Sequence, residues 1–331
     1  MTEDHGLAER VIRKLAESGV GAGTGGVELH RLEGGHSGLT YWLNAGDRRL
    51  VVKAVPPGRR PIGRHDMLRQ ARILLALAGT AVPVPSVVAV DESEPAWFAM
   101  SWLDGEAVEP VLDGLARPAD LVRSRACTAT EVLAALHAVD VSGLAEGAVP
   151  QSAADELATW SKVLRAGVAD FVEDGVRLAE SLGRDVPAPV TPCLVHGDYR
   201  LGNVMFAGEA ISGVVDWEIW GVGDPRLDLG YFTVFSDPAT FPGIGAAAPG
   251  LPAADELWQV YSAQAARPVG DAVWFTALGR LKMAAIMSHN LHRHRTGRHL
   301  DPAQETLPPT IGALIVGGLR MLSQPTTTTG G

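Results

Sequence analysis

The segment from residue 194 to residue 218 constrains this chain more than any other part of it. Its sequence begins Leu-Val-His-Gly-Asp-Tyr-Arg-Leu-Gly-Asn, continues through two short apolar runs that break at Gly208, and ends in Val-Asp-Trp-Glu. Such a break between apolar runs is typical of a hairpin. Asn203 follows Asp198 by five positions, and Asp216 comes directly after the second run. We therefore predict that these three oxygen-bearing side chains gather at one end of a small hairpin.

Phosphoryl transfer from a nucleotide requires this set of side chains. A carboxylate must orient the attacking hydroxyl and accept its proton, and we assign this catalytic role to Asp198. Hard cations prefer oxygen ligands, so we assign Mg²⁺ binding to Asn203 and Asp216. The spacing is that of the protein-kinase signature H-R-D-x-x-x-x-N with a later metal-binding Asp, although Gly197 replaces the Arg and Asp-Trp-Glu replaces Asp-Phe-Gly. Any one of these residues alone is as readily a turn or cap residue.

Residues 196–203 and 215–229 resemble the aminoglycoside phosphotransferase (APH) and choline-kinase-like family, whose members are distant relatives of protein kinases. The resemblance implies an α+β fold of the protein-kinase-like, two-lobed type: a small antiparallel β-sheet with one helix, and a larger, mainly helical lobe. Within the second stretch we interpret Asp224 as a turn or helix cap and Asp228 as a buried anchor for the catalytic loop.

The resemblance also implies a division of the chain. We expect an N-terminal nucleotide-binding lobe over residues 1–103, a hinge at about 100–105, and a C-terminal helical lobe over 104–325 with the catalytic loop and the acceptor site. Residues 326–331, which are four threonines and two glycines, are expected to form a disordered tail. The apolar spacing predicts helices over residues 7–15, 65–78, 121–139, 155–171, 253–266 and 271–294.

Residues 27–55 predict three antiparallel strands that would hold a nucleotide. The loop between the first two strands is rich in glycine, and its backbone N–H groups, at Ser37 and Gly38, could approach phosphates. The third strand carries Lys53 among valines, like the kinase sequence V-A-I-K. The chain has only four lysines, so a lysine kept in this strand indicates a need for a compact ammonium near phosphates. The alternative is an edge-strand lysine that faces solvent.

The helix predicted over residues 65–78 should supply the partner of Lys53. In kinases a Glu of this helix pairs with the strand lysine, but Gln70 stands where the family pattern Arg-Glu-x-x-x-Leu has its Glu. Gln70 can accept a hydrogen bond but offers no counter-charge, and Asp66, one turn earlier, is the alternative partner. The resemblance further implies that the backbone around Ser101 and Leu103 binds the adenine edge.

Composition excludes several other classes of protein. With 46% hydrophobic and 20% charged residues, the chain is typical of folded globular proteins. A net charge of −10 disfavours nucleic acid, whose phosphates need a basic face. The two cysteines, Cys127 and Cys193, indicate neither a disulfide framework nor a zinc site. The charged N-terminus and the absence of a long apolar run lead us to expect a cytoplasmic protein with no membrane partner.

We therefore predict a small-molecule phosphotransferase that moves the γ-phosphate of ATP or GTP to a substrate hydroxyl with the help of Mg²⁺. Lys53 would contact the phosphates, and Asp198 would act on the hydroxyl. The alternative is a catalytically weak, nucleotide-binding regulatory module of the same fold, for which Gln70 is the main argument. A metal hydrolase would need more histidines near residues 198–216 than the chain supplies.

The acceptor stays open at this stage. The acidic charge fits an aminoglycoside-like polycation and hence a role in antibiotic resistance, whereas the basic residues of 280–298 fit an apolar or anionic hydroxylated metabolite. A subgroup of the family that resembles residues 196–229 is linked to hydroxyacyl thioesters. The sequence does not indicate the oligomeric state.

Overall fold

The computed structural model describes residues 2–20, 28–32, 39–56, 58–144, 149–265 and 269–324. The chain divides into two compact units, of which the first comprises Met1–Glu106 and Met205–Ile219. The second comprises Ala107–Val204 and Trp220–Gly331. The expected phosphate loop with Ser37 and Gly38, and the expected tail over 326–331, lie outside the described residues.

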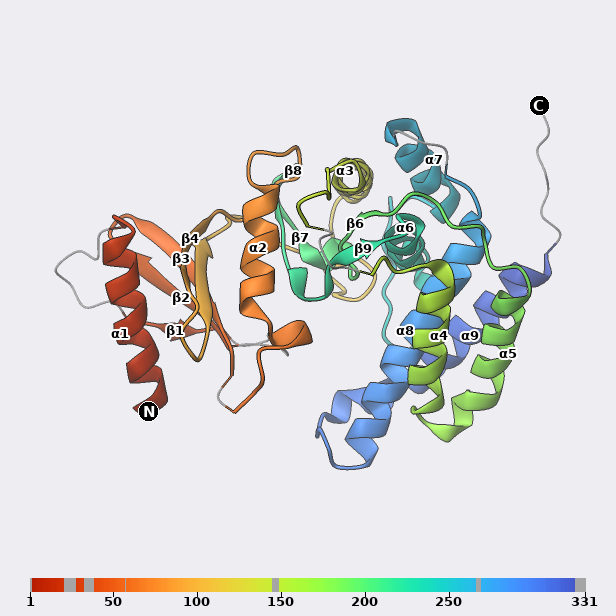
Figure 1. Cartoon of the computed structure of the whole chain (residues 1–331). Coiled ribbons are helices and arrows are strands. Elements are labelled where there is room, and N and C mark those ends of the chain that lie inside the picture. Colours follow the sequence, from red (N-terminus) through yellow and green to blue (C-terminus); the bar gives the residue numbers. More distant parts are fainter. Residues whose placement is uncertain are drawn as a thin grey trace. The chain divides into compact units, whose positions relative to one another are not determined.

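An antiparallel five-stranded sheet is the framework of the first unit (Figure 1). Its strands lie in the order β1 (His30–Arg31), β2 (Leu39–Ala45), β3 (Arg48–Ala54), β5 (Trp97–Ser101) and β4 (Val87–Asp91). In this register Lys53 of β3 stands opposite Thr40 on one side and Phe98 on the other. Because β3 has a hydrogen-bonded neighbour on both sides, Lys53 is not an edge-strand lysine.

Two helices flank this sheet, one more than the family resemblance implied. Helix α1 (Thr2–Glu17) packs Leu7 and Val11 against a core that includes Val52 and Ala54 of β3. Helix α2 (Met67–Leu77) contacts β4 and β5 and lies on the other side of the sheet (Figure 1). Successive residues of a strand point to opposite faces. Lys53 therefore faces away from α1.

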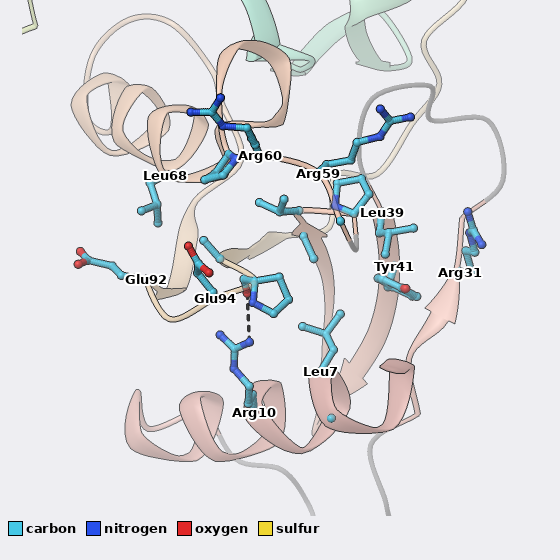
Figure 2. A pocket seen from close by; sticks show the side chains of 18 residues that line it. Leu7, Arg10, Arg31, Leu39, Tyr41, Arg59, Arg60, Leu68, Glu92 and Glu94 are labelled. Atoms are coloured by element: carbon cyan, nitrogen blue, oxygen red, sulfur yellow. Dashed lines mark hydrogen bonds between the residues drawn. The ribbon is translucent and has the colours of Figure 1, made fainter. Parts of the chain in front are cut away.

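A pocket of about 910 Å³ opens on the α1 face of the sheet (Figure 2). Leu7, Tyr41 and Ala54 line it, and Arg10 of α1 bounds it while donating a hydrogen bond to the carbonyl of Pro95 at 3.1 Å. Because Ala54 and Lys53 are successive residues of β3, this pocket is on the opposite face from the lysine.

The hairpin of strands β7 (Val204–Ala207) and β8 (Ala210–Val214) joins the first unit although it follows the loop of residues 196–203 in sequence. The peptide N–H of Glu106 donates to the carbonyl of Phe206 at 3.0 Å, and Val214 donates to the carbonyl of Pro83 at 2.8 Å. A Cβ at Gly105, whose φ is +115°, would lie 2.1 Å from the Phe206 oxygen, so this close approach requires glycine. The hairpin predicted around Gly208 is confirmed.

Helices make up most of the second unit. They are α3 (Ala119–His137), α4 (Ala153–Arg165), α5 (Val172–Arg184), α6 (Arg226–Thr233), α7 (Ala254–Gln264), α8 (Ala272–Arg295) and α9 (Pro308–Ser323). A two-stranded sheet pairs β6 (Cys193–Val195) with β9 (Gly221–Gly223). Short 3₁₀ turns are η1 (Gly63–His65) and η4 (Trp217–Ile219) in the first unit and η2 (Ala169–Phe171), η3 (Leu201–Asn203), η5 (Val234–Ser236), η6 (Pro238–Thr240) and η7 (Pro302–Thr306) in the second.

The long helix α8 is the centre of the helical unit. It packs against α4, α5, α6 and α9. Helices surrounded in this way bury residues on all sides, which matches the many buried residues of α8. Among the described residues, no helix is long and apolar enough to cross a membrane.

Candidate active site

A buried carboxylate anchors the loop that follows β6. Asp228 of α6, 1% exposed, accepts hydrogen bonds from the peptide N–H groups of His196 at 2.6 Å and Gly197 at 2.8 Å. His137, at the end of α3, lies with Nε2 3.3 Å from the same carboxylate. Burial alone would raise the pKa of Asp228, but the hydrogen bonds and charges of His137 and His196 hold it below its usual value. The predicted anchor role of Asp228 is confirmed.

Gly197 has a backbone conformation that suits glycine. Its φ is +84°, in the left-handed region where a side chain is strained. This explains why glycine takes the place of the Arg in the kinase signature. Asp224 accepts a hydrogen bond from the N–H of Arg226 at 2.9 Å, which confirms the predicted turn, whereas the N-cap of α6 is Pro225.

Asp198 and Asn203 are joined by hydrogen bonds within the second unit. The side-chain amide of Asn203 donates to the carbonyl of Asp198 at 2.8 Å and to its carboxylate at 2.9 Å. Because the amide nitrogen makes both bonds, the amide oxygen of Asn203 is the atom left to meet a cation. The side chain of Asp198 is 27% exposed, with Arg200 Nε 3.8 Å away. A carboxylate held in this way can meet a ligand without losing its orientation.

Tyr231 and Lys282 support the same loop, and sequence reasoning missed both roles. The buried hydroxyl of Tyr231 is hydrogen-bonded to Asp198, and burial followed by the charge of Asp198 raises its pKa well above the usual value. Lys282 of α8 donates to the carbonyl of Gly197, and its Nζ lies 4.3 Å from the ring centroid of Tyr231. The scarcity of lysine, which drew attention to Lys53, was an equal signal for Lys282.

Glu109 is a third residue whose role sequence reasoning missed. It is 1% exposed, and its carboxylate accepts a hydrogen bond from the N–H of Gly202 at 3.2 Å. Arg200 Nη1 lies 3.9 Å away, and Oε1 of Glu109 has no hydrogen-bond partner in the part of the chain that the structure describes. Burial raises the pKa of Glu109 to about 7. A glutamate in an apolar stretch was the signal that could have found it.

Lys53 meets two carboxylates of the first unit. Its Nζ lies 3.4 Å from Oε1 of Glu218 and 3.8 Å from Oδ1 of Asp216. Asp216 has a φ of +65°, a conformation that costs a non-glycine residue on the order of 1 kcal/mol. Such strain is typical of functional positions.

Neither of the partners expected for Lys53 takes that role. The side-chain amide of Gln70 donates to the carbonyl of Arg64 at 3.0 Å, and Gln70 is 2% exposed. Asp66 accepts from the N–H of Arg69 at 2.9 Å and so caps α2. Both side chains are thus committed to local backbone, which sequence position alone does not reveal. The expectation that Gln70 or Asp66 pairs with Lys53 is corrected to Glu218 and Asp216.

The strand end proposed for adenine binding offers one free backbone position. The N–H of Ser101 donates to the carbonyl of Ser86 at 2.9 Å and is therefore occupied. Within the described ranges, no hydrogen bond involves the backbone of Leu103. Leu103 is thus the better placed of the two expected adenine contacts.

The available donors suit magnesium better than a metal held by protein alone. Among the residues that the structure describes, no group of three or more His, Cys, Asp or Glu could hold a metal ion. Magnesium bound with a nucleotide needs only one or two protein oxygens, because phosphates and water supply the remainder. The amide oxygen of Asn203 and the carboxylate of Asp216 are oxygens of this kind.

A central-strand lysine on a small antiparallel sheet, together with an Asp-x-x-x-x-Asn loop in a helical unit, defines a protein of kinase-like fold. Residues 28–268 match the family described as "Phosphotransferase enzyme family" (APH). The chain belongs to this family, as its resemblance predicted.

Solved structures agree on the fold. A Ralstonia eutropha protein assigned as an aminoglycoside phosphotransferase superposes with a TM-score of 0.78 at 24% identity, covering 95% of this chain and 97% of its own. Aminoglycoside phosphotransferase APH(4)-Ia, solved with AMP-PNP and hygromycin B, has a TM-score of 0.60 at 17% identity and covers 96% and 99%. The α+β, protein-kinase-like two-lobed fold expected from the sequence is confirmed.

Curated relatives include much longer proteins. Mouse acyl-CoA dehydrogenase family member 10 is 29% identical over 298 residues, which are 83% of this chain and 27% of the relative. Human acyl-CoA dehydrogenase family member 11 is 27% identical over 286 residues, 80% of this chain and 36% of the relative. Viomycin phosphotransferase of Streptomyces vinaceus is 29% identical over 210 residues, 59% of this chain and 70% of that enzyme. The chain thus spans about a third or less of the first two relatives.

Proposed function

We propose that this chain transfers the γ-phosphate of ATP or GTP to a hydroxyl group of a small molecule. The observation that carries the proposal is the hydrogen-bonded pair of Asp198 and Asn203 on a loop anchored by Asp228. Membership of a phosphotransferase family supports the reaction class. The exposed part of Asp198 is available to a substrate hydroxyl, whose proton it would accept.

Each remaining site residue has a proposed task. Lys53 contacts the phosphates, Leu103 binds the adenine edge through its backbone, and the loop with Ser37 and Gly38 covers the phosphates. Asn203 and Asp216 would hold Mg²⁺, which would neutralise charge on the phosphates. The proposed lobes, residues 1–103 and 104–325, divide nucleotide binding from catalysis and acceptor binding. Because the transition state of phosphoryl transfer is loose, positioning and charge neutralisation do most of the work.

The alternative of a catalytically weak regulatory module has less support. Gln70 was its main argument, because a neutral residue stands where the family has its Glu. Glu218 supplies a carboxylate beside Lys53 from another position, at 3.4 Å. The charge that the module hypothesis counted as lost is therefore present.

Two acceptor classes follow from the relatives. APH(4)-Ia was solved with hygromycin B, and another relative is named for viomycin, so one class is a cationic antibiotic. The acyl-CoA dehydrogenase family relatives favour the other class, a hydroxyacyl thioester.

A transfer assay tests the proposal. The purified chain is incubated with Mg²⁺ and either γ-labelled ATP or γ-labelled GTP, against a panel of aminoglycosides, peptide antibiotics and hydroxyacyl thioesters. We expect labelled phosphate on the hydroxyl of at least one acceptor class. Tight nucleotide binding without transfer to any hydroxylated compound would instead support the regulatory module.

A further inference from the structure

We infer that Glu218 is the positioning residue of Lys53, in the role that a glutamate of the α2 helix has in kinases. The inference rests on the proposed function, because it concerns how Lys53 is held for the phosphates. Glu218 is the last residue of the Asp-Trp-Glu sequence. In the family pattern, the glutamate that pairs with the strand lysine stands at the position of Gln70. Glu218 acts through Lys53 and is not itself assigned to substrate.

The pair of Lys53 and Glu218 is shielded from solvent. The side chain of Lys53 is 12% exposed and that of Glu218 is 14% exposed, with 3.4 Å between ammonium and carboxylate. Ion pairs at this degree of burial are screened less than pairs on the surface. Asp216 is the weaker partner, since its side chain is 42% exposed and 3.8 Å away.

Helix α2 still helps to position the carboxylate beside Lys53, because a side chain of α2 binds the backbone of Glu218. Arg69 of α2 donates from Nη1 to the carbonyl oxygen of Glu218 at 3.4 Å. The turn η4, which carries Glu218, contacts both α2 and η1. The helix thus positions the turn that bears the carboxylate, although it supplies no carboxylate of its own to Lys53.

The buried side chain of Trp217 holds this turn in place. Its side chain is 2% exposed, and its indole N–H donates to the carbonyl of Val214 at 2.9 Å. Asp216 and Glu218 are therefore fixed on either side of one buried anchor. If Asp216 is drawn to Mg²⁺, Glu218 remains as the counter-charge for Lys53. One turn then serves both the metal and the lysine.

A double-mutant cycle tests the inference. Wild type, Lys53→Met, Glu218→Gln and the double variant are titrated with Mg²⁺ and AMP-PNP by calorimetry. Glu218→Gln should weaken nucleotide binding about tenfold, the size of one lost charge-assisted contact. In the Lys53→Met background the same change should have almost no further effect, because Glu218 acts through the lysine. Glu209→Gln, the same substitution at an exposed position of the β7–β8 turn, is the matched control and should bind like wild type.

Several outcomes would overturn the inference. Additive losses in the cycle would show that Glu218 acts independently of Lys53. Recovery of Glu218→Gln to wild-type affinity at high Mg²⁺ would make Glu218 a metal ligand. Failure of the wild type to bind nucleotide would overturn the proposed function itself, and is thus distinct from either result.

A second cycle covers variants that bind too weakly to titrate. The same four proteins are unfolded in urea without nucleotide, and circular dichroism confirms that each is folded at the start. We expect the two substitutions to be less destabilising together than the sum of their separate effects. Strict additivity in urea would overturn the inference, because Lys53 and Glu218 would then have no mutual attraction in the free protein.

Discussion

At the scale of single residues, two neighbours hold the carboxylate of Asp198 in place. The hydroxyl of Tyr231 and the amide of Asn203 both reach its carboxylate. The Asp198→Ala variant should lose about 10²- to 10⁴-fold in kcat, as expected for removal of a general base. Its Kd for the nucleotide should stay near that of wild type, because no nucleotide contact is assigned to this residue. Steady-state kinetics measure kcat, and calorimetry measures Kd. A kcat within about tenfold of wild type, smaller than the loss expected for a general base, would contradict the assignment.

Glu109 makes the stability of the protein depend on pH. Its pKa is raised to about 7 in the folded state from an ordinary value of 4.5, so between these values the folded state binds more protons than the unfolded state. Stability contributed by this group therefore falls as pH rises through that interval, by roughly 3 kcal/mol in full. Arg200, which lowers this pKa, and Asp113 and Asp198, which raise it, are the charges that face Glu109.

The Glu109→Gln variant removes this titration. Relative to wild type, its unfolding free energy should increase on going from pH 5 to pH 8, by up to about 3 kcal/mol. Urea unfolding at the two pH values measures the difference. Glu131→Gln, an exposed position on α3, should give the same difference from wild type at both. If the difference in unfolding free energy between Glu109→Gln and wild type is the same at both pH values, Glu109 ionises normally in the folded protein.

At the scale of elements, the loop that carries Asp198 depends on α6. Asp228 accepts hydrogen bonds from the peptide N–H groups of His196, which is buried, and Gly197, which is partly buried. Asp228→Ala would leave both without a partner, and we expect a loss of about 2–4 kcal/mol in unfolding free energy, measured in urea. Asp228→Asn keeps the shape and an accepting oxygen, so it should lose less than Asp228→Ala. Equal stability of Asp228→Ala and wild type would contradict the anchor role.

The elements that the sequence predicted are those with strong local signals. The helices at 121–139, 253–266 and 271–294 correspond to α3, α7 and α8, and the hairpin broken at Gly208 is present. Helix α9 was not predicted because it begins with two prolines and contains three glycines, a composition typical of loops. Proline is tolerated in the first helical turn, where its missing N–H has no intrahelical partner. The predicted helix over 155–171 was too long, since α4 ends at Arg165.

The site shows the same division between local and tertiary information. The loop containing Asp198 and Asn203 and the position of Lys53 could be predicted from spacing and strand pattern. The roles of Glu109, Tyr231 and Lys282 could not, because their partners lie far along the chain and only packing brings them together. The scarcity of lysine and a glutamate in an apolar stretch mark only the positions of Lys282 and Glu109. The partner of Lys53 was mispredicted for the same reason, since Glu218 is 165 positions away in sequence.

At the scale of the whole molecule, the first unit is made of two segments that are separate in sequence. The segment Met205–Ile219 belongs to the first unit, whereas the residues before and after it belong to the second. The proposed metal ligand Asp216 thus belongs to the same unit as Lys53, although it follows Asn203 by only thirteen positions. Unfolding of the first unit would remove Asp216, so binding of Mg²⁺ with a nucleotide should be linked to the folding of that unit.

This linkage predicts how a ligand changes thermal stability. At a nucleotide concentration of about 100 times Kd, Mg²⁺ with AMP-PNP should raise the unfolding free energy by about 2.7 kcal/mol and increase Tm accordingly. Removal of Mg²⁺ with EDTA should abolish most of the increase. Asp216→Asn should also abolish most of the Tm increase, with Mg²⁺ present, because an amide carries no charge for the cation. Asn is chosen because it tolerates the positive φ of this position better than Ala would. Differential scanning fluorimetry measures all three, with Glu209→Gln as the control, and a full Tm increase in Asp216→Asn would remove this residue from the proposed metal site.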